Sequence, residues 1–451
     1  MTNLPVWPPA PPLGGRQAEI QQLTAAAAEG RCLSLVGMSN VGKSYVLRAL
    51  CQAAPAATAA FIYIDCNRMV EFSEQGLYEL VLRCMNAGLP LQGELAPLGA
   101  ELERCYGDVV SPSTHFLAHL RFNAGLAAAC EQLDRPLVLV LDALDEIMQG
   151  IDDRVLLNLR ALRDTYPQRL SYLTASRRRL GTARHARGAG EFAELFAQNT
   201  YFLAPLAGQA ATAVVGQCAR EGSLSLAPSD MPLLCDETGG HPALLVSVSY
   251  ALSTLRQDAQ ATRRHLSEER VHEQLDSDAA CQAECAKLWQ ELDQEERQAL
   301  LHWEAQDAAR RQAASQSLLE RHLLRHSEDD LVPFCRLLAS FVRRQRIARR
   351  AENRGVRVDV EAGDVWIDGR LLPTLTDLEY RLLLLLYGHL DKIVDKYTVV
   401  QVVWGQEYID EVDDGRIEKL VSRLRQKLEA DPARPRYLHT IRGRGYKLVS
   451  P

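Results

Sequence analysis

A glycine-rich octapeptide near the start of the chain constrains its fold more than any other feature. Residues 37–44 read Gly-Met-Ser-Asn-Val-Gly-Lys-Ser and match the pattern G-x-x-x-x-G-K-[ST] at every fixed position. An apolar, β-prone run precedes it at 32–36, and a segment with helical spacing follows at 45–50. A strand that turns sharply into a helix points backbone N–H groups and the positive helix end at one spot. The pattern therefore predicts a loop that binds phosphates.

The fixed positions of this loop are predicted to bind ATP or ADP together with Mg²⁺. Gly37 and Gly42 allow the backbone to wrap a triphosphate, and the ammonium group of Lys43 can reach the β and γ phosphates. The hydroxyl of Ser44 is the predicted ligand of Mg²⁺ within the loop. The loop and the residue after it supply the other predicted nucleotide contacts, which are Asn40, Val41 and Tyr45.

A second motif supplies acidic side chains about a hundred residues further on. Residues 137–142 read Leu-Val-Leu-Val-Leu-Asp, and a strand that is apolar on both faces belongs inside a covered parallel sheet. Its carboxyl end is then predicted to lie beside the phosphate loop, where Asp142 holds the Mg²⁺ shell. Because Asp145 and Glu146 follow closely, one of them can orient the attacking water.

Composition limits the classes of protein to which this chain can belong. A length of 451 residues predicts about two to four domains, and 47% hydrophobic with 24% charged residues is typical of soluble proteins. There is no apolar run of about eighteen residues and no signal peptide, so we expect a cytoplasmic protein that does not enter a membrane. The 11 cysteines form no C-x-x-C pair, which argues against a zinc site or a disulfide framework.

Further segments resemble STAND NTPases, the group that includes the NACHT and NB-ARC families. The acids at 142–146 read Asp-Ala-Leu-Asp-Glu, similar to the D-G-L-D-E form of NACHT-like members, whereas motor-type AAA+ proteins usually place Glu directly after the metal-binding Asp. Gly15 and Arg16 open a segment that resembles the h-h-G-R-x-x-E element beside the adenine. Gly240 and Pro242 resemble the G-x-P motif, whose proline packs on the adenine. The resemblance implies that these residues bind nucleotide.

Residues 170–177 look like the fourth strand of that family, which ends in a sensor arginine. The resemblance implies that Arg177 touches the γ phosphate. Four further arginines are predicted to lie on a solvated basic face, namely Arg178, Arg179, Arg184 and Arg187. Residues 89–112 are interpreted as a loop-like insertion because they contain Gly and Pro and show no clean period.

Beyond the predicted sheet the chain reads as helices, similar to the lid and winged helix of STAND proteins. Residues 207–275 are assigned to the lid and residues 276–348 to the winged helix. NB-ARC members carry Met-His-Asp there, with the histidine on the ADP phosphate, whereas this chain has Pro-Phe-Cys at 333–335. The resemblance therefore supplies no histidine that would hold ADP. The arginine-rich linker at 349–354 is either a solvated connector or a segment that lies along phosphates.

A new period begins near residue 355. Residues 356–370 alternate like strands, and Thr376 with Glu379 three positions later forms a capping box that starts a helix. With Thr-Ile-Arg-Gly-Arg-Gly-Tyr at 440–446, the span 355–451 closely resembles the winged-helix DNA-binding domain of OmpR/PhoB-type regulators. This resemblance implies that the chain binds double-stranded DNA.

The helix expected at 414–429 can be phased from its apolar residues, which fall on one stripe. The polar residues left outside suit a helix in a major groove, and they are Arg416, Lys419, Ser422, Arg423, Gln426 and Lys427. The following hairpin offers three residues to phosphates or to a minor groove, and they are Thr440, Arg442 and Arg444. Because the net charge is −7, any DNA-binding surface must be local.

These observations predict an α/β P-loop NTPase, with helices on both faces of a parallel sheet, followed by an α-helical lid and two winged-helix domains. The expected divisions are a Pro-rich arm (1–14), the NTPase domain (15–206) and the lid (207–275). A STAND-type winged helix (276–348), a basic linker (349–354) and an OmpR/PhoB-type winged helix (355–451) follow. The predicted function is a bacterial transcriptional regulator switched by nucleotide, with slow ATP hydrolysis. Its predicted partners are DNA, RNA polymerase and further copies of the chain.

Two other functions stay open. A AAA+-like DNA loader or transposition helper would hydrolyse ATP in a ring and would need an arginine from a neighbouring subunit, for which Arg178 and Arg179 are the candidates. A STAND defence or stress-signalling protein would instead use its terminal winged helix to bind another protein.

Overall fold

The computed structural model divides the chain into two compact units, residues 1–342 (unit 1) and residues 343–451 (unit 2), which we describe separately. The residues that it describes are 15–53, 58–148, 150–181, 187–262, 267–303, 312–327, 330–352, 354–360, 362–406 and 412–449. The Pro-rich arm predicted at 1–14 lies outside them. No described helix is long and apolar enough to cross a membrane.

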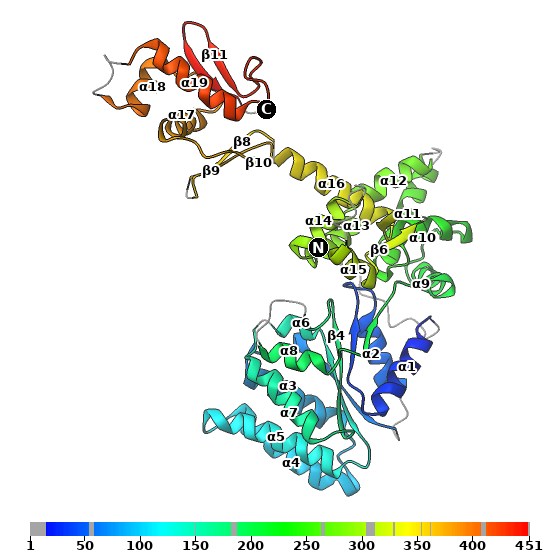
Figure 1. Ribbon diagram of the computed structural model, residues 1–451. Helices are drawn as coiled ribbons and strands as arrows, with labels where there is room; N and C mark the ends of the chain where they lie inside the picture. The colour runs from blue at the N-terminus through cyan, green and yellow to red at the C-terminus, as the bar shows by residue number, and fades with distance from the viewer. Residues whose placement is uncertain are drawn as a thin grey trace. The chain divides into compact units, whose positions relative to one another are not determined.

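Unit 1 contains a sheet of five parallel strands, which confirms the predicted α/β fold (Figure 1). In spatial order the strands are β2 (Ala60–Asp65), β3 (Leu137–Asp142), β4 (Leu170–Ser176), β1 (Leu33–Val36) and β5 (Thr200–Phe202). Strand β3 is buried on both faces, because Val138 and Val140 belong to one hydrophobic core whereas Leu139 and Leu141 belong to another. Both faces of the sheet are therefore covered by helices.

The helices of this domain lie in two layers (Figure 1). The first core is covered by α1 (Gln17–Ala28) and α2 (Lys43–Ala53). The second is covered by α3 (Glu74–Gly88), α4 (Ala96–Val110), α5 (His115–Gln132), α6 (Leu144–Ile147), α7 (Asp153–Thr165) and α8 (Arg187–Glu194). Short 3₁₀ turns occur at η2 (Cys66–Arg68) and η3 (Gly93–Leu95).

The interpretation of residues 89–112 as a loop-like insertion is wrong. Most of this segment is helix α4, which packs on α5. Its buried side chains recur every three to four residues, and they are Leu98, Leu102, Cys105 and Val109. The helix forms because this stripe is covered, although Pro97, Gly99 and Gly107 interrupt the local helical signal.

The rest of unit 1 is mainly helical. Four helices follow the sheet, α9 (Gly208–Glu221), α10 (Met231–Thr238), α11 (Pro242–Ala261) and α12 (Glu268–Ser277), with a 3₁₀ turn η4 (Pro228–Asp230). Three more helices, a hairpin and a long helix come next, α13 (Ala279–Gln290), α14 (Gln294–Leu301), α15 (Gln312–Glu320), β6 (Leu324–Ser327), β7 (Asp330–Pro333) and α16 (Arg336–Glu352). Of α16, residues 336–342 belong to unit 1 and residues 343–352 to unit 2, and the latter include part of the predicted basic linker.

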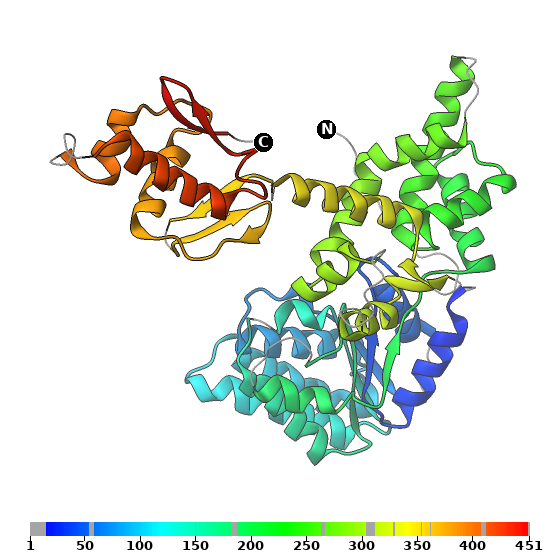
Figure 2. The ribbon, with the colours of Figure 1, turned by 45° about the horizontal axis from the view of Figure 1, so that its top comes forward.

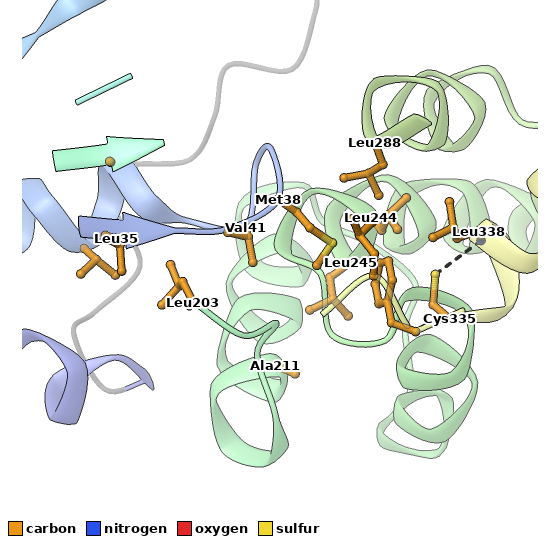
Figure 3. Packing of buried hydrophobic residues seen from close by; sticks show 14 of the residues in the cluster. Leu35, Met38, Val41, Leu203, Ala211, Leu244, Leu245, Leu288, Cys335 and Leu338 are labelled. Atoms are coloured by element: carbon orange, nitrogen blue, oxygen red, sulfur yellow. Dashed lines mark hydrogen bonds between the residues drawn. The ribbon is translucent and has the colours of Figure 1, made fainter. Parts of the chain in front are cut away.

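The phosphate loop shares a core with these helices. Met38 and Val41 of the loop, Leu203 after β5, and Leu244 and Leu338 of the helical part belong to one buried cluster (Figure 3). The apolar side chains of the loop therefore pack against residues of the sheet and also against residues of the helices that follow the sheet.

Unit 2 is a small α/β domain with its own core (Figure 2). Its elements are β8 (Val356–Asp359), β9 (Asp364–Ile367), β10 (Arg370–Leu371), α17 (Asp377–Gly388), α18 (Lys396–Val403), α19 (Asp414–Leu428), β11 (Leu438–Ile441) and β12 (Gly445–Leu448). The predicted capping box is present, since Glu379 Oε2 accepts a hydrogen bond from Thr376 N at 2.9 Å. Three helices with the hairpin β11–β12 form the predicted winged-helix fold.

Candidate functional site

The octapeptide forms a sharp turn between β1, which ends at Val36, and α2, which begins at Lys43. Asn40 and Gly42 have positive φ angles of 58° and 106°. A Cβ atom built on Gly42 would have no neighbour within 4 Å, so there is open space above this part of the turn. The loop therefore has both the backbone shape and the room that a bound phosphate requires.

Lys43 lies folded over the loop. Its Nζ donates to Gly37 O at 2.8 Å and to Met38 O at 2.9 Å. Burial lowers the pKa of Lys43, whereas the nearby charges of Glu291, Asp145 and Asp142 raise it. A partly buried ammonium group at the start of α2, beside the open space at Gly42, fits the phosphates of a nucleotide.

The predicted magnesium ligands lie on two different elements. Ser44 is in the first turn of α2, and Asp142 is the last residue of β3. Tyr63 Oη, from the adjacent strand β2, donates to Asp142 Oδ2 at 2.6 Å, and Arg48 Nε donates to Tyr63 Oη at 3.1 Å. A hydroxyl and a carboxylate suit Mg²⁺, which prefers oxygen ligands and keeps part of its shell for phosphates and water. Sequence reasoning missed Tyr63, which fixes the orientation of this carboxylate.

The three residues proposed for hydrolysis lie together. Arg177, which directly follows β4, donates from Nε to Asp145 Oδ2 at 2.8 Å, and its Nη2 lies 2.9 Å from Glu146 Oε1. The backbone N of Arg177 donates to the same Asp145 oxygen at 3.1 Å. This arginine therefore holds both acids at the carboxyl ends of β3 and β4.

Among the residues assigned to the adenine side, Arg16 contacts the loop, and Gly15 and Gly240 approach the segment after β5 closely. Arg16 Nη2 donates to Ala204 O at 2.6 Å and to Val41 O at 3.3 Å. A Cβ atom on Gly15 would lie 2.6 Å from that of Ala210, and one on Gly240 would lie 1.8 Å from Leu206 O. Only glycine fits position 240, and Pro242 begins α11 two residues later.

Side chains from the helical part that follows the sheet contact the phosphate loop, and His241 and Glu284 are two of them. His241 Nδ1 accepts from Leu244 N, so its Nε2 carries the proton and donates to Ser39 O at 2.8 Å. Burial lowers the pKa of His241 to about 4, which keeps the ring neutral near pH 7. Asn40 Nδ2 donates to Glu284 Oε2 on α13 at 2.9 Å. Neither contact was predicted from the sequence, because each joins distant segments.

Of the four arginines predicted to lie on a solvated face, Arg178 and Arg179 form ion pairs instead, and Arg184 lies outside the described residues. Arg178 Nη1 lies 2.8 Å from Asp293 Oδ2, and its Nη2 also pairs with the buried Glu296. Arg179 Nε donates to Glu320 Oε2 at 3.1 Å. These acids are recruited from α14, α15 and the turn before α14, which sequence spacing alone could not reveal.

Helix α19 presents the predicted polar face. Its apolar stripe is buried, and five residues of the predicted outward set are exposed, namely Arg416, Lys419, Ser422, Arg423 and Gln426. Lys427 is an exception, since its Nζ donates to Glu379 Oε2 at 2.7 Å and to Thr374 O at 3.0 Å. Its inclusion in the outward set was wrong, because a buried carboxylate on α17 recruits it.

The hairpin β11–β12 carries the remaining assigned residues. Arg442 and Arg444 are exposed in the turn, next to Gly443 with a φ of 69°. Thr440 is exposed as well, and its Oγ1 accepts a hydrogen bond from Arg425 Nη2 at 2.7 Å. Two guanidinium groups thus stand on a tight turn, where they can meet phosphates.

Two family models match the chain. Residues 12–181 match the AAA ATPase domain, and residues 372–448 match the C-terminal domain of transcriptional regulatory proteins. The second region is 39% identical over 92 residues to the uncharacterized transcriptional regulatory protein YrkP of Bacillus subtilis, covering 20% of this chain and 39% of that protein. It is 39% identical over 97 residues to the sensory transduction protein RegX3 of Mycobacterium tuberculosis, covering 22% and 41%. The chain thus spans about two fifths of the length of these relatives.

Two solved structures are among those to which the chain is similar. A Walker-type ATPase of Pyrococcus abyssi is 14% identical, with a TM-score of 0.44, over 73% of this chain and 95% of that chain. The DNA-binding domain of CpxR from E. coli is 32% identical, with a TM-score of 0.18, over 21% of this chain and 91% of that chain. From the two family matches, this chain combines an AAA ATPase domain with a C-terminal transcriptional regulatory domain of the OmpR/PhoB type.

Proposed function

We propose that this chain is an ATP-dependent transcriptional regulator of the STAND type, in which the bound nucleotide sets the affinity of unit 2 for DNA. The observation that carries the proposal is the pair of hydrogen bonds from the phosphate loop to the helices after the sheet. Ser39 O contacts His241, and Asn40 contacts Glu284. A ligand that changes the loop must therefore act on α11 and α13, and it shifts the protein toward the arrangement that binds it better.

In this proposal the residues of the site divide the work of binding and slow hydrolysis. Lys43 and the loop N–H groups hold the phosphates, while Ser44 and Asp142 hold Mg²⁺, which when bound neutralises phosphate charge. When Arg177 contacts the γ phosphate, it releases the carboxylates of Asp145 and Glu146. One of these two carboxylates then orients the attacking water molecule. Gly15, Arg16, Gly240 and Pro242 border the adenine.

The DNA-binding part of the proposal rests on exposure and charge. Helix α19 enters the major groove with Arg416, Lys419 and Arg423, and the hairpin turn contacts phosphates or a minor groove. A protein that acts on transcription in this way works on double-stranded DNA in the cytoplasm, where RNA polymerase and further copies of the chain are its proposed partners.

The DNA-loader alternative is weaker. It needs an arginine that reaches the nucleotide of a neighbouring subunit, and both candidates are engaged within their own chain. Arg178 pairs with Asp293 and Glu296, and Arg179 pairs with Glu320. No specific observation favours a defence or stress-signalling role for the terminal winged helix.

The two classes of DNA contact should respond differently to alanine substitution. If Arg423 reads a base, Arg423→Ala should weaken binding at the preferred site by about 1–3 kcal/mol and relax specificity there. Arg442→Ala should weaken binding to all duplexes about equally, because a phosphate contact carries no sequence information. Fluorescence anisotropy on specific and random duplexes measures both effects. Equal losses on every duplex for Arg423→Ala would contradict base reading.

The proposed switch is tested with the full chain carrying Glu146→Gln, which should bind ATP while hydrolysing it slowly. Its affinity for specific DNA should differ between ATP, ADP and no nucleotide, because occupancy rather than turnover sets the state. The measurement is DNA affinity in the three conditions, with light scattering to record the oligomeric state. The same affinity in all three conditions would reject the switch, whereas a need for turnover and a ring-sized particle would favour the loader.

A further inference from the structure

The phosphate loop is already in contact with an anion of its own chain. Glu291, the residue that follows α13, accepts hydrogen bonds from Ser39 N through Oε1 and Oε2, each at 3.2 Å. Its side chain is only 4% exposed. Among the acids around Lys43, Glu291 exerts the strongest charge effect, ahead of Asp145 and Asp142. A carboxylate from the helical part thus stands where the loop has its donors and its ammonium group.

The position of Glu291 is fixed by the residue that follows the sensor arginine. Arg178 donates to the backbone O of Glu291 from Nε at 3.1 Å and from Nη2 at 2.7 Å. The same guanidinium pairs with Asp293 and Glu296, which begin the next helix. The turn between α13 and α14 is therefore clamped to the end of β4, and this clamp aims the carboxylate at the loop.

We propose that Glu291 is an intramolecular phosphate mimic, which occupies the phosphate loop in the nucleotide-free protein and must be displaced before ATP can bind. This inference rests on the proposed nucleotide site but not on the coupling to DNA. The chemical reason is competition between anions. Backbone N–H groups of a phosphate loop bind negative oxygens, and a carboxylate offers two of them. The phosphates of ATP and the carboxylate cannot share the Ser39 N–H group, and their negative charges repel each other at this distance.

A second cation is ready to receive the displaced carboxylate. Arg321 is buried, and its Nη1 donates to both oxygens of Glu296 at 3.0 and 3.2 Å. Its Nη2 lies 3.5 Å from Glu291 Oε2, and among the described residues neither Nη2 nor Nε has a hydrogen-bond partner. A small rotation of the Glu291 side chain would satisfy one of these buried donors. The carboxylate contacts both the loop and Arg321 in this structure, at 3.2 and 3.5 Å, and in the proposal nucleotide displaces it from the loop toward Arg321.

The inference is tested by titrating Mg²⁺–ATP into three forms of the nucleotide-free full chain. Glu291→Gln keeps the shape of the side chain but removes its charge, so the dissociation constant should fall about tenfold or more, the size expected for one charge-assisted hydrogen bond. Glu295→Gln is the matched control, because it removes an exposed charge from the same segment, and its affinity should equal that of the wild type. Thermal melts of the three proteins check that each is folded.

A second measurement follows the loop directly. In the nucleotide-free wild type, hydrogen exchange at the Ser39 amide should be slow, and Glu291→Ala should accelerate it, since the acceptor is removed. Unchanged or weaker ATP binding by Glu291→Gln, or equal exchange at Ser39 in wild type and Glu291→Ala, would overturn the inference. If DNA affinity proves insensitive to nucleotide while Glu291→Gln still binds ATP more tightly, the inference stands and only the proposed switch fails. Absence of ATP binding in both proteins would overturn both.

Discussion

Replacing Lys43 with alanine should weaken binding of Mg²⁺–ATP about 100-fold, because a charge-assisted contact to phosphate contributes about 1.5–3 kcal/mol. The folded state should tolerate the change. Burial lowers the pKa of Lys43, so its charge is held in the protein at an energetic cost, which offsets the loss of its bonds to Gly37 O and Met38 O and of its attraction to nearby acids. Isothermal titration with ATP gives the affinity, and thermal melting checks stability.

The matched control for this substitution is Arg31→Ala. Arg31 is a half-exposed cation of the same domain that pairs with Glu29, so its loss changes the net charge equally without touching the loop. ATP affinity should be unchanged in this variant. If Lys43→Ala also binds ATP with unchanged affinity, residues 37–44 are not the phosphate loop of a nucleotide site.

Replacing Glu296 with alanine should lower the free energy of unfolding of the protein by about 3–5 kcal/mol, which is typical when one member of a buried ion pair is removed. Glu296 is buried and accepts from Ser317 Oγ at 2.8 Å and from Arg321 Nη1 at 3.0 Å. Without it, Glu291 is the remaining ion-pair partner of the buried Arg321 among the residues that the structure describes. Urea unfolding followed by circular dichroism measures the loss.

Glu295→Ala provides the comparison for stability. It lies one position away and is exposed, so it should change the free energy of unfolding by less than about 0.5 kcal/mol. A loss of under about 1 kcal/mol in Glu296→Ala would mean that water reaches Arg321, and the ion pair would then not be a structural element of unit 1.

Local sequence signals predicted the parts of the site that depend on neighbours in the chain. The octapeptide with its flanking strand and helix, the acidic end of β3 and the buried stripe of α19 were all evident from spacing. Each of these signals reports a short-range requirement, such as a tight turn, burial on both faces of a strand or one apolar helix face. Helix α4 carried the same kind of stripe, but its glycines concealed it.

The contacts that surround the loop could not be predicted in this way. Ser39 and Glu291 are 252 residues apart in the chain, and Ser39 and His241 are 202 apart. Tyr63 reaches Asp142 only because β2 and β3 pair in the sheet, and Lys427 turns inward only because Glu379 lies under it. Such pairings follow from tertiary packing, so the sequence could not indicate which side chains contact the predicted site residues.

The apolar cluster shared by the phosphate loop and the helices sets a lower limit on the work of opening unit 1. Met38 and Val41 are fully buried in the same cluster as Leu244 and Leu338. Separating the helices from the sheet would expose such side chains to water, at about 1.5–3 kcal/mol for each large one. Any ligand that opens this unit must supply that free energy through its own contacts. Small rearrangements of polar side chains around Ser39 are therefore far cheaper than a wide swing of the helices, whatever signal initiates them.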